Sequence, residues 1–188
     1  MEKSTDEELM SMILKKNTKA LRILYNRYEV SIFNYILKYT GSRDIAQDLL
    51  QETFTRVWYA AHTFSQESGK FRGWLYTIAL NNTRNEMVKK RYDYHYVDVT
   101  EIKGEQEPVH PQAEQPDVQL EHSDLKDTIA KALGKLKPHL REIIVLKQFQ
   151  QLKFREIAEI TKVPEGTLKA RFHRAIAKLK PLLEAVEF

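Results

Sequence analysis

Basic side chains gather in one stretch near the C-terminus, with types and spacing that suit contact with a polyanion. Residues 153–180 carry eight basic and three acidic side chains, a net charge of +5. Ammonium and guanidinium groups bind phosphates, and an arginine can also pair bidentately with guanine. The candidate contacts, which include one hydroxyl from the middle of this stretch, are Thr167, Lys169, Arg171, His173, Arg174 and Lys178.

Two short helices are predicted to position these side chains. Apolar residues recur at helical spacing over residues 154–160 and again over 168–179. Between them, Pro164 cannot continue a helix and Gly166 permits a sharp bend. The pattern predicts a helix-turn-helix, whose second helix fits the major groove of DNA. A helical hairpin with a solvated charged face is the alternative. The predicted inward face of the second helix consists of Leu168, Phe172, Ala175, Ile176 and Leu179.

The first 90 residues also show helical periodicity, which predicts a small bundle. A capping box from Ser4 to Glu7 predicts a short helix that ends near Lys16. Three longer helices follow, with polar or glycine-containing breaks between them. These helices are predicted over residues 18–39, 43–61 and 74–90, with a polar loop at 62–73.

An acidic, proline-containing segment divides the chain. Residues 92–122 carry eight acidic side chains, one basic side chain and three prolines, with no sustained apolar period. This composition predicts a flexible linker. Helical periodicity returns at Asp124 and predicts four more helices. The expected fold is therefore all-α, with small helical domains at residues 1–91 and 123–188 joined by the acidic linker at 92–122.

Composition narrows the possible functions. The 188 residues include no cysteine, which excludes disulfides and thiolate metal sites. No apolar run reaches membrane-spanning length and no secretory signal pattern is present, so we expect a cytoplasmic protein without direct membrane insertion. The six histidines form no i, i+4 pair, and no phosphate-binding glycine loop or nucleophile motif occurs. We therefore expect no catalytic residue, no metal or other cofactor, and no small-molecule substrate.

A second basic block suggests a second contact with the same polyanion. Residues 70–91 carry six basic side chains and one acidic side chain. The predicted loop at 64–73, which overlaps the start of this block, combines Phe64 and Phe71 with Lys70 and Arg72. Stacking of an unpaired base on an aromatic ring is worth about 1–3 kcal/mol, comparable to the cost of unstacking one base step. These residues are therefore candidates for contact with opened DNA strands.

Two carboxylates four residues apart form a third candidate site. Asp44 and Asp48 share one face of a predicted helix. Such a pair could bind a metal ion or act as acid and base. An ordinary solvated face is the alternative, and the spacing alone favours it. Gln51, Glu52 and Arg56 extend the same polar surface.

Four blocks of the sequence, in this order, resemble the extracytoplasmic-function (ECF) sigma factors of the sigma-70 family. They are ALRILYNRY at 20–28, DIAQDLLQETF at 44–54 followed by Val57 and Trp58, FRGWLYTIALN at 71–81, and VPEGTLKAR at 163–171. The blocks span both predicted domains. An acidic linker stands where larger sigma factors have a middle domain, which is typical of the ECF group.

The resemblance implies an alternative transcription initiation factor that recognises the −35 and −10 promoter elements and helps to open the DNA strands. The basic residues of the second helix of the helix-turn-helix would face the −35 element. The segment from 64 to 89 would capture a flipped base of the −10 element, with Asn81 and Asn85 on one face. The implied −10 contacts are Phe64, Lys70, Arg72, Asn81, Arg84, Asn85 and Lys89.

The resemblance also implies partners. Core RNA polymerase would be bound through the coiled coil of its largest subunit and through its flap, and an anti-sigma factor would be a further partner. The linker would bridge both domains on one promoter or lie in the RNA channel of the polymerase. A passive spacer is the alternative. The implied polymerase contacts are Asp48, Leu50, Gln51, Glu52 and Phe54, of which Leu50 and Phe54 would be apolar anchors.

An autonomous helix-turn-helix regulator is the alternative function. Its N-terminal domain would serve dimerisation or sensing, and a regulator of this kind recognises paired half-sites as a dimer. The matched asparagines and the basic strand-opening segment favour the sigma factor instead.

Overall fold

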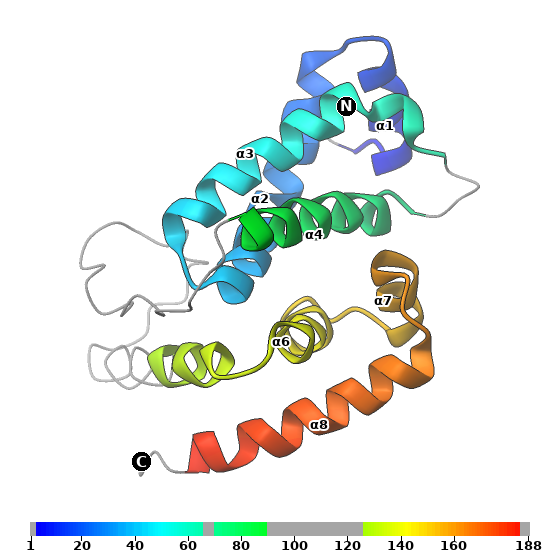
Figure 1. Ribbon diagram of the computed structural model, residues 1–188. Coiled ribbons are helices and arrows are strands. Elements are labelled where there is room, and N and C mark those ends of the chain that lie inside the picture. Colours follow the sequence, from blue (N-terminus) through cyan, green and yellow to red (C-terminus); the bar gives the residue numbers. More distant parts are fainter. Residues whose placement is uncertain (1–2, 66–69, 90–125, 185–188) are drawn as a thin grey trace.

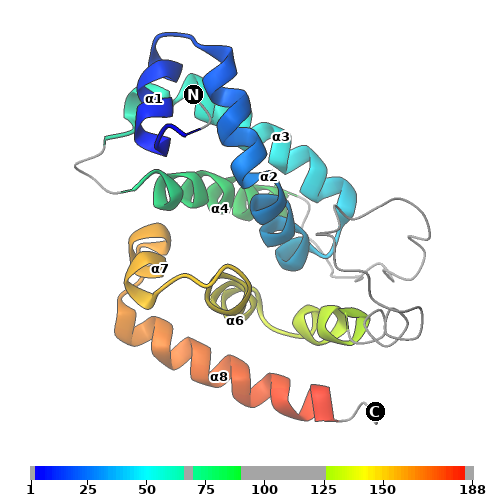
Figure 2. The same ribbon diagram turned by 180° about the vertical axis from the view of Figure 1, so that it is seen from behind.

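The structure is a computed structural model that describes residues 3–65, 70–89 and 126–184. All regular elements among these residues are helical, which confirms the predicted all-α fold. Two groups of helices lie one above the other in Figure 1, and the view from behind in Figure 2 shows the same arrangement. The predicted linker at 92–122 lies outside the described residues.

We name the two groups the N-terminal bundle and the C-terminal bundle. The N-terminal bundle consists of α1 (Asp6–Leu14), α2 (Thr18–Thr40), α3 (Arg43–Tyr59), the short 3-10 helix η1 (Ala61–Thr63) and α4 (Phe71–Lys89). The C-terminal bundle consists of a helix at 126–134, α6 (Pro138–Ile144), the π-helix η4 (Val145–Phe149), α7 (Phe154–Thr161) and α8 (Glu165–Glu184).

The first helix starts one residue later than predicted. The Thr5 hydroxyl accepts the Glu8 N–H at 3.2 Å, and the Glu8 carboxylate accepts the Thr5 N–H at 2.9 Å, so the capping box runs from Thr5 to Glu8. The predicted box from Ser4 to Glu7 is therefore wrong. Both pairs have the required spacing, but the observed one leaves the Ser4 carbonyl available to Arg27, which donates to it at 2.8 Å.

Helix α4 begins at Phe71, three residues before the predicted start. Phe71 is fully buried and lies within a cluster of aromatic rings, with centroids 5.4 Å from Tyr28, 6.1 Å from Phe64 and 6.0 Å from Trp74. Burial of this ring favours the helical start at Phe71 over the polar loop that the sequence predicted. Phe71 and Arg72 are consequently part of the helix.

The predicted helix-turn-helix is present as α7 and α8, but two details differ. The bend is made at Lys162, which has a left-handed φ of 59° and ends α7. Gly166 lies inside the first turn of α8, so it does not make the predicted bend. Leu168, Ala175 and Leu179 are buried as predicted, whereas Ile176 is 40% exposed. At about 100° per residue, Ile176 lies at the edge of the inward face and not at its centre.

The two bundles pack against each other through α2 and α4 on one side and α6, η4 and α7 on the other. Arg141 is fully buried at this interface. Its guanidinium donates to the carbonyl of Tyr39 in α2 and to three carbonyls of its own bundle, at 2.8–3.1 Å. A buried cation is costly unless its donors are satisfied, so Arg141 ties the C-terminal end of α2 to the turn before α6.

Two tyrosines at the same interface differ in one contact. Tyr35 and Tyr76 are both fully buried, with ring centroids 5.8 Å apart. The Tyr76 hydroxyl donates to Oε1 of Gln150 at 2.6 Å. The Tyr35 hydroxyl has no hydrogen-bond partner within the described part of the chain. Burial, together with the charge of Glu142, raises the pKa of Tyr35 well above its ordinary value.

Tyr35→Phe is therefore expected to leave the free energy of unfolding unchanged or to raise it, because the change removes a buried hydroxyl that lacks a partner. Tyr76→Phe should lower the free energy of unfolding by about 1–3 kcal/mol, because the buried Gln150 amide loses its donor. Urea unfolding of the two variants beside the wild type measures the difference. A greater loss for Tyr35→Phe than for Tyr76→Phe would contradict this account.

Candidate nucleic-acid interface

Helix α8 exposes a face that is bordered on both sides by basic side chains. At 100° per residue, residues 167, 171, 174 and 178 form one row, and Lys169 and His173 form a second row on the other side. The small side chains of Ala170 and Ala177 lie between the rows and are exposed, which leaves room for close approach to a groove. Five of the six predicted contacts are exposed and Arg171 is half-buried; they are Thr167, Lys169, Arg171, His173, Arg174 and Lys178.

The cationic surface extends from α8 onto the start of α6, a feature that sequence reasoning missed. Burial and the charges of Arg171, Lys137 and Arg174 lower the pKa of His139. Because charges act on a pKa in this way only at short range, the first turn of α6 lies beside the row of α8 that contains Arg171 and Arg174. The sequence feature that could have indicated this surface is the pair of basic residues, Lys137 and His139, on either side of Pro138, which starts the helix.

Helix α4 places the two predicted −10 asparagines together. Asn81 and Asn85 are exposed and one turn apart, whereas Asn82 is buried and donates to the Thr53 hydroxyl at 3.4 Å. Lys70 and Lys89 are exposed at the two ends of this region.

The aromatic side chains predicted to stack on bases pack against other aromatic rings of the protein. Phe71 is fully buried, and the half-buried Phe64 packs against Phe71 and against Trp74, with centroids 6.1 and 5.6 Å away. In this arrangement the three rings form the support of the first turn of α4, and Phe71 presents no face to a base.

Two further predicted −10 contacts are engaged by the C-terminal bundle. Arg84 donates from Nε and Nη2 to the carboxylate of Glu142 at 2.9 and 2.7 Å, and the Glu142 side chain is only 5% exposed. Arg72 donates to the Gln150 carbonyl at 2.6 Å and lies over the Tyr76 ring, 5.7 Å from its centroid. Burial alone would lower the pKa of Arg84, but the hydrogen bonds and charge of Glu142 outweigh it and raise that pKa.

Helix α3 presents the polar residues predicted to contact polymerase, but not the apolar ones. Asp48, Gln51 and Glu52 are exposed. Leu50 and Phe54 are only 6% and 5% exposed and belong to the core, and their role as apolar anchors stays a prediction. Both side chains face α2: the Phe54 ring lies 4.8 Å from the Tyr25 ring between centroids, and Leu50 lines a hollow together with residues of α2.

Two shallow hollows lie between α2 and α3 over these buried side chains. One, of about 400 Å³, is lined by Val30, Phe33, Leu37, Arg43 and Leu50 among others. The other, of about 520 Å³, is lined by Leu21, Tyr25, Phe54, Trp58 and Gln51 among others. Leu50 and Phe54 thus form part of the floor of an accessible, mainly apolar surface.

The Asp44 and Asp48 pair remains without further ligands. Both carboxylates are exposed, and the described residues contain no cluster of three or more His, Asp or Glu side chains that could hold a metal ion. The described helices also include none that is long and apolar enough to cross a membrane.

The fold and the basic face of α8 define a helical DNA-binding protein with a helix-turn-helix in its C-terminal bundle. The sequence matches the family model of sigma-70 region 2 over residues 24–92 and that of sigma-70 region 4 over residues 126–179. It is 29% identical over 165 residues to RNA polymerase sigma factor YlaC of Bacillus subtilis (strain 168), covering 88% of this chain and 92% of YlaC. It is also 29% identical over 189 residues to the ECF RNA polymerase sigma-E factor of Escherichia coli (strain K12), covering 97% and 98%. The chain belongs to the ECF group of the sigma-70 family and is an alternative sigma factor.

Two solved structures share the fold over nearly the whole chain. CnrH, in complex with the cytosolic domain of CnrY, matches with a TM-score of 0.70 and 25% identity, covering 97% of this chain and 99% of that chain. RpoE, in complex with the anti-sigma factor NepR from Bartonella quintana, matches with a TM-score of 0.66 and 25% identity, covering 90% and 99%.

Proposed function

We propose that this sigma factor reads a promoter at two places, with α8 on the −35 element and α4 on the −10 element. The observation that carries the proposal is the exposed face of α8, where two basic rows flank small side chains on a helix of the kind that fits a major groove. Asn81 and Asn85, side by side on α4, support the second reader. The proposed domain limits are residues 1–91 and 123–188, with a linker at 92–122.

Core RNA polymerase would bind at α3 and carry out the chemistry. Asp48, Gln51 and Glu52 supply polar contacts for the coiled coil of its largest subunit. Leu50 and Phe54 contribute by shaping the floor of the hollows between α2 and α3. The C-terminal bundle would bind the flap. The sigma factor itself performs no chemical step, requires no cofactor and works in the cytoplasm beside polymerase and DNA.

The packing of the two bundles explains why the free protein should bind promoter DNA weakly. The Glu142 carboxylate accepts two hydrogen bonds from Arg84, in the bidentate geometry that a phosphate would use. The Gln150 carbonyl accepts a hydrogen bond from Arg72. Two of the proposed −10 contacts are therefore withheld from DNA in the closed arrangement. Polymerase would separate the bundles and set both readers at promoter spacing, which raises the effective concentration of each reader at its element.

An anti-sigma factor is the remaining proposed partner. CnrH is in complex with the cytosolic domain of CnrY, and RpoE is in complex with the anti-sigma factor NepR. The similarity of both to the packed arrangement of this chain, at TM-scores of 0.70 and 0.66, supports a partner that binds the closed form.

Run-off transcription with core RNA polymerase on a genomic fragment library tests the proposal. We expect new start sites that appear only when the protein is added. In gel shifts, the free protein should bind these fragments weakly and the holoenzyme tightly. Tight binding by the protein alone, without redirected initiation, would instead indicate an autonomous regulator.

A further inference from the structure

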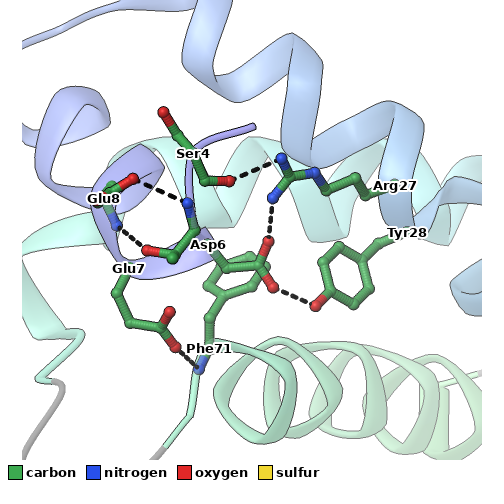
Figure 3. A network of polar contacts seen from close by, with 8 residues as sticks. Ser4, Asp6, Glu7, Glu8, Arg27, Tyr28 and Phe71 are labelled. Carbon is green, nitrogen blue, oxygen red and sulfur yellow. Dashed lines mark hydrogen bonds and ion pairs between the residues drawn. The ribbon is translucent and has the colours of Figure 1, made fainter. Parts of the chain in front are cut away.

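The start of the chain is tied to α2 by a network of polar contacts. Figure 3 shows the Asp6 carboxylate between Arg27 and Tyr28 of α2. Arg27 donates to Asp6 at 2.8 Å and to the Ser4 carbonyl at 2.8 Å, and the Tyr28 hydroxyl donates to the second Asp6 oxygen. Burial, followed by the hydrogen bond and charge of Asp6, raises the pKa of Tyr28, so its hydroxyl stays protonated as the donor.

Two contacts connect this network to Phe71, the first residue of α4. The ring of Tyr28 packs edge-on against Phe71, with centroids 5.4 Å apart. The Glu7 carboxylate accepts the backbone N–H of Phe71 at 3.5 Å, across 64 positions of sequence (Figure 3). The first N–H groups of a helix lack partners within the helix, and a negative charge is favourable there. Glu7 therefore caps α4 from another helix, while Asp6 holds the ring on which Phe71 rests.

These contacts act on one end of α4 only. The body of α4 packs against α3, α2 and α7, and the contacts with Glu7 and with the Asp6-bound Tyr28 meet at Phe71. Arg72, a proposed −10 contact, follows directly, and its charge acts on Tyr28, which places the two side chains close together. Loss of these contacts would loosen the first turn of α4, which the rings of Phe64 and Trp74 still support, whereas Asn81, some 15 Å further along at about 1.5 Å per residue, would stay in place.

We propose that Asp6 and Glu7 are positioning residues for strand opening, which fix the first turn of α4 and with it Arg72 against the −10 DNA. This inference rests on the proposed function. It assigns to α1 a role in opening the promoter that is separate from polymerase binding and from −35 recognition.

The test uses full-length Asp6→Asn, Glu7→Gln and the double variant, assembled with core RNA polymerase. Glu8→Gln is the matched control, because it makes the same chemical change on the next residue and a glutamine still completes the capping box. Each holoenzyme is assayed on a duplex promoter and on the same promoter with a mismatched, already open −10 region. Permanganate reactivity of unpaired thymines reports strand opening.

The double variant should open the duplex promoter about tenfold less, as expected for the loss of charge-assisted hydrogen bonds, and should regain wild-type activity on the open template. Its competition for core polymerase should equal that of the wild type. Full opening of the duplex by the double variant overturns the inference, and so does an equal defect on both templates. Failure of the wild type to direct transcription would instead refute the proposed function.

Discussion

Replacing Glu142 with glutamine is expected to raise the affinity of the free protein for promoter DNA by about tenfold. The two hydrogen bonds from Arg84 join the bundles, and bonds to charged groups contribute about 1.5–3 kcal/mol to stability. Arg84 is 38% exposed, so solvent screens the pair and the lower end of that range applies. About 1.4 kcal/mol corresponds to a tenfold change in the equilibrium between closed and open forms. Gel shifts of the free protein at fixed salt measure the effect.

Two further variants make this result specific. Glu159→Gln removes the same charge from the exposed pair between Arg155 and Glu159, and should leave DNA affinity unchanged. Arg84→Gln also breaks the interface but removes a proposed DNA contact, so its affinity should rise less than that of Glu142→Gln. If Glu142→Gln binds DNA no better than the wild type, the pair does not hold the bundles closed.

Arg174→Ala is expected to reduce −35-dependent transcription by the holoenzyme about tenfold or more. Arg174 is exposed in one of the two basic rows, and its Nε donates to the Ala170 carbonyl at 3.3 Å, which steadies the side chain along the helix. A bidentate contact with a base is worth about 1–3 kcal/mol. Run-off transcription from promoters with intact and scrambled −35 elements measures the loss, which should appear only on the intact element.

Lys15→Ala is the control for this experiment, because it removes one exposed positive charge from the far end of the N-terminal bundle. It should not change the −35 dependence. The salt dependence of holoenzyme binding adds a second readout, since loss of a phosphate contact reduces the salt slope by about one, whereas loss of a base contact changes sequence preference. An Arg174→Ala holoenzyme with unchanged activity and unchanged salt slope would place the −35 reader elsewhere.

Periodicity and turn residues were sufficient to predict the helices and the helix-turn-helix, because both depend on local spacing. The errors arose where two local solutions compete. Ser4 and Thr5 both begin a valid capping box, and only the contacts of Arg27 distinguish them. Ile176 fits the apolar period of α8, but it lies at the edge of the buried face and is 40% exposed. Lys162 takes the left-handed bend that a glycine usually takes.

The closed interface could not be predicted from the sequence at all. Arg84, Glu142 and Gln150 are polar residues on helices far apart in the chain, and no periodicity marks a polar side chain that finds its partner in another bundle. The same limit applies to Leu50 and Phe54. Their types suit an apolar anchor, but whether such a side chain points into the core or out of it depends on the packing of α2 against α3.

The π-helix η4 offers a simple way to change the strength of the contact between the two bundles. Its N–H of Gln150 donates to the carbonyl of Val145, five residues back, so the segment contains one residue more than an α-helix would need. Deletion of a single residue there would replace the wide turn with an α-helical turn and so displace Gln150, whose carbonyl and side chain contact Arg72 and Tyr76. Natural selection could therefore weaken the contact between the bundles by a one-codon deletion, without altering any residue that is proposed to face the promoter.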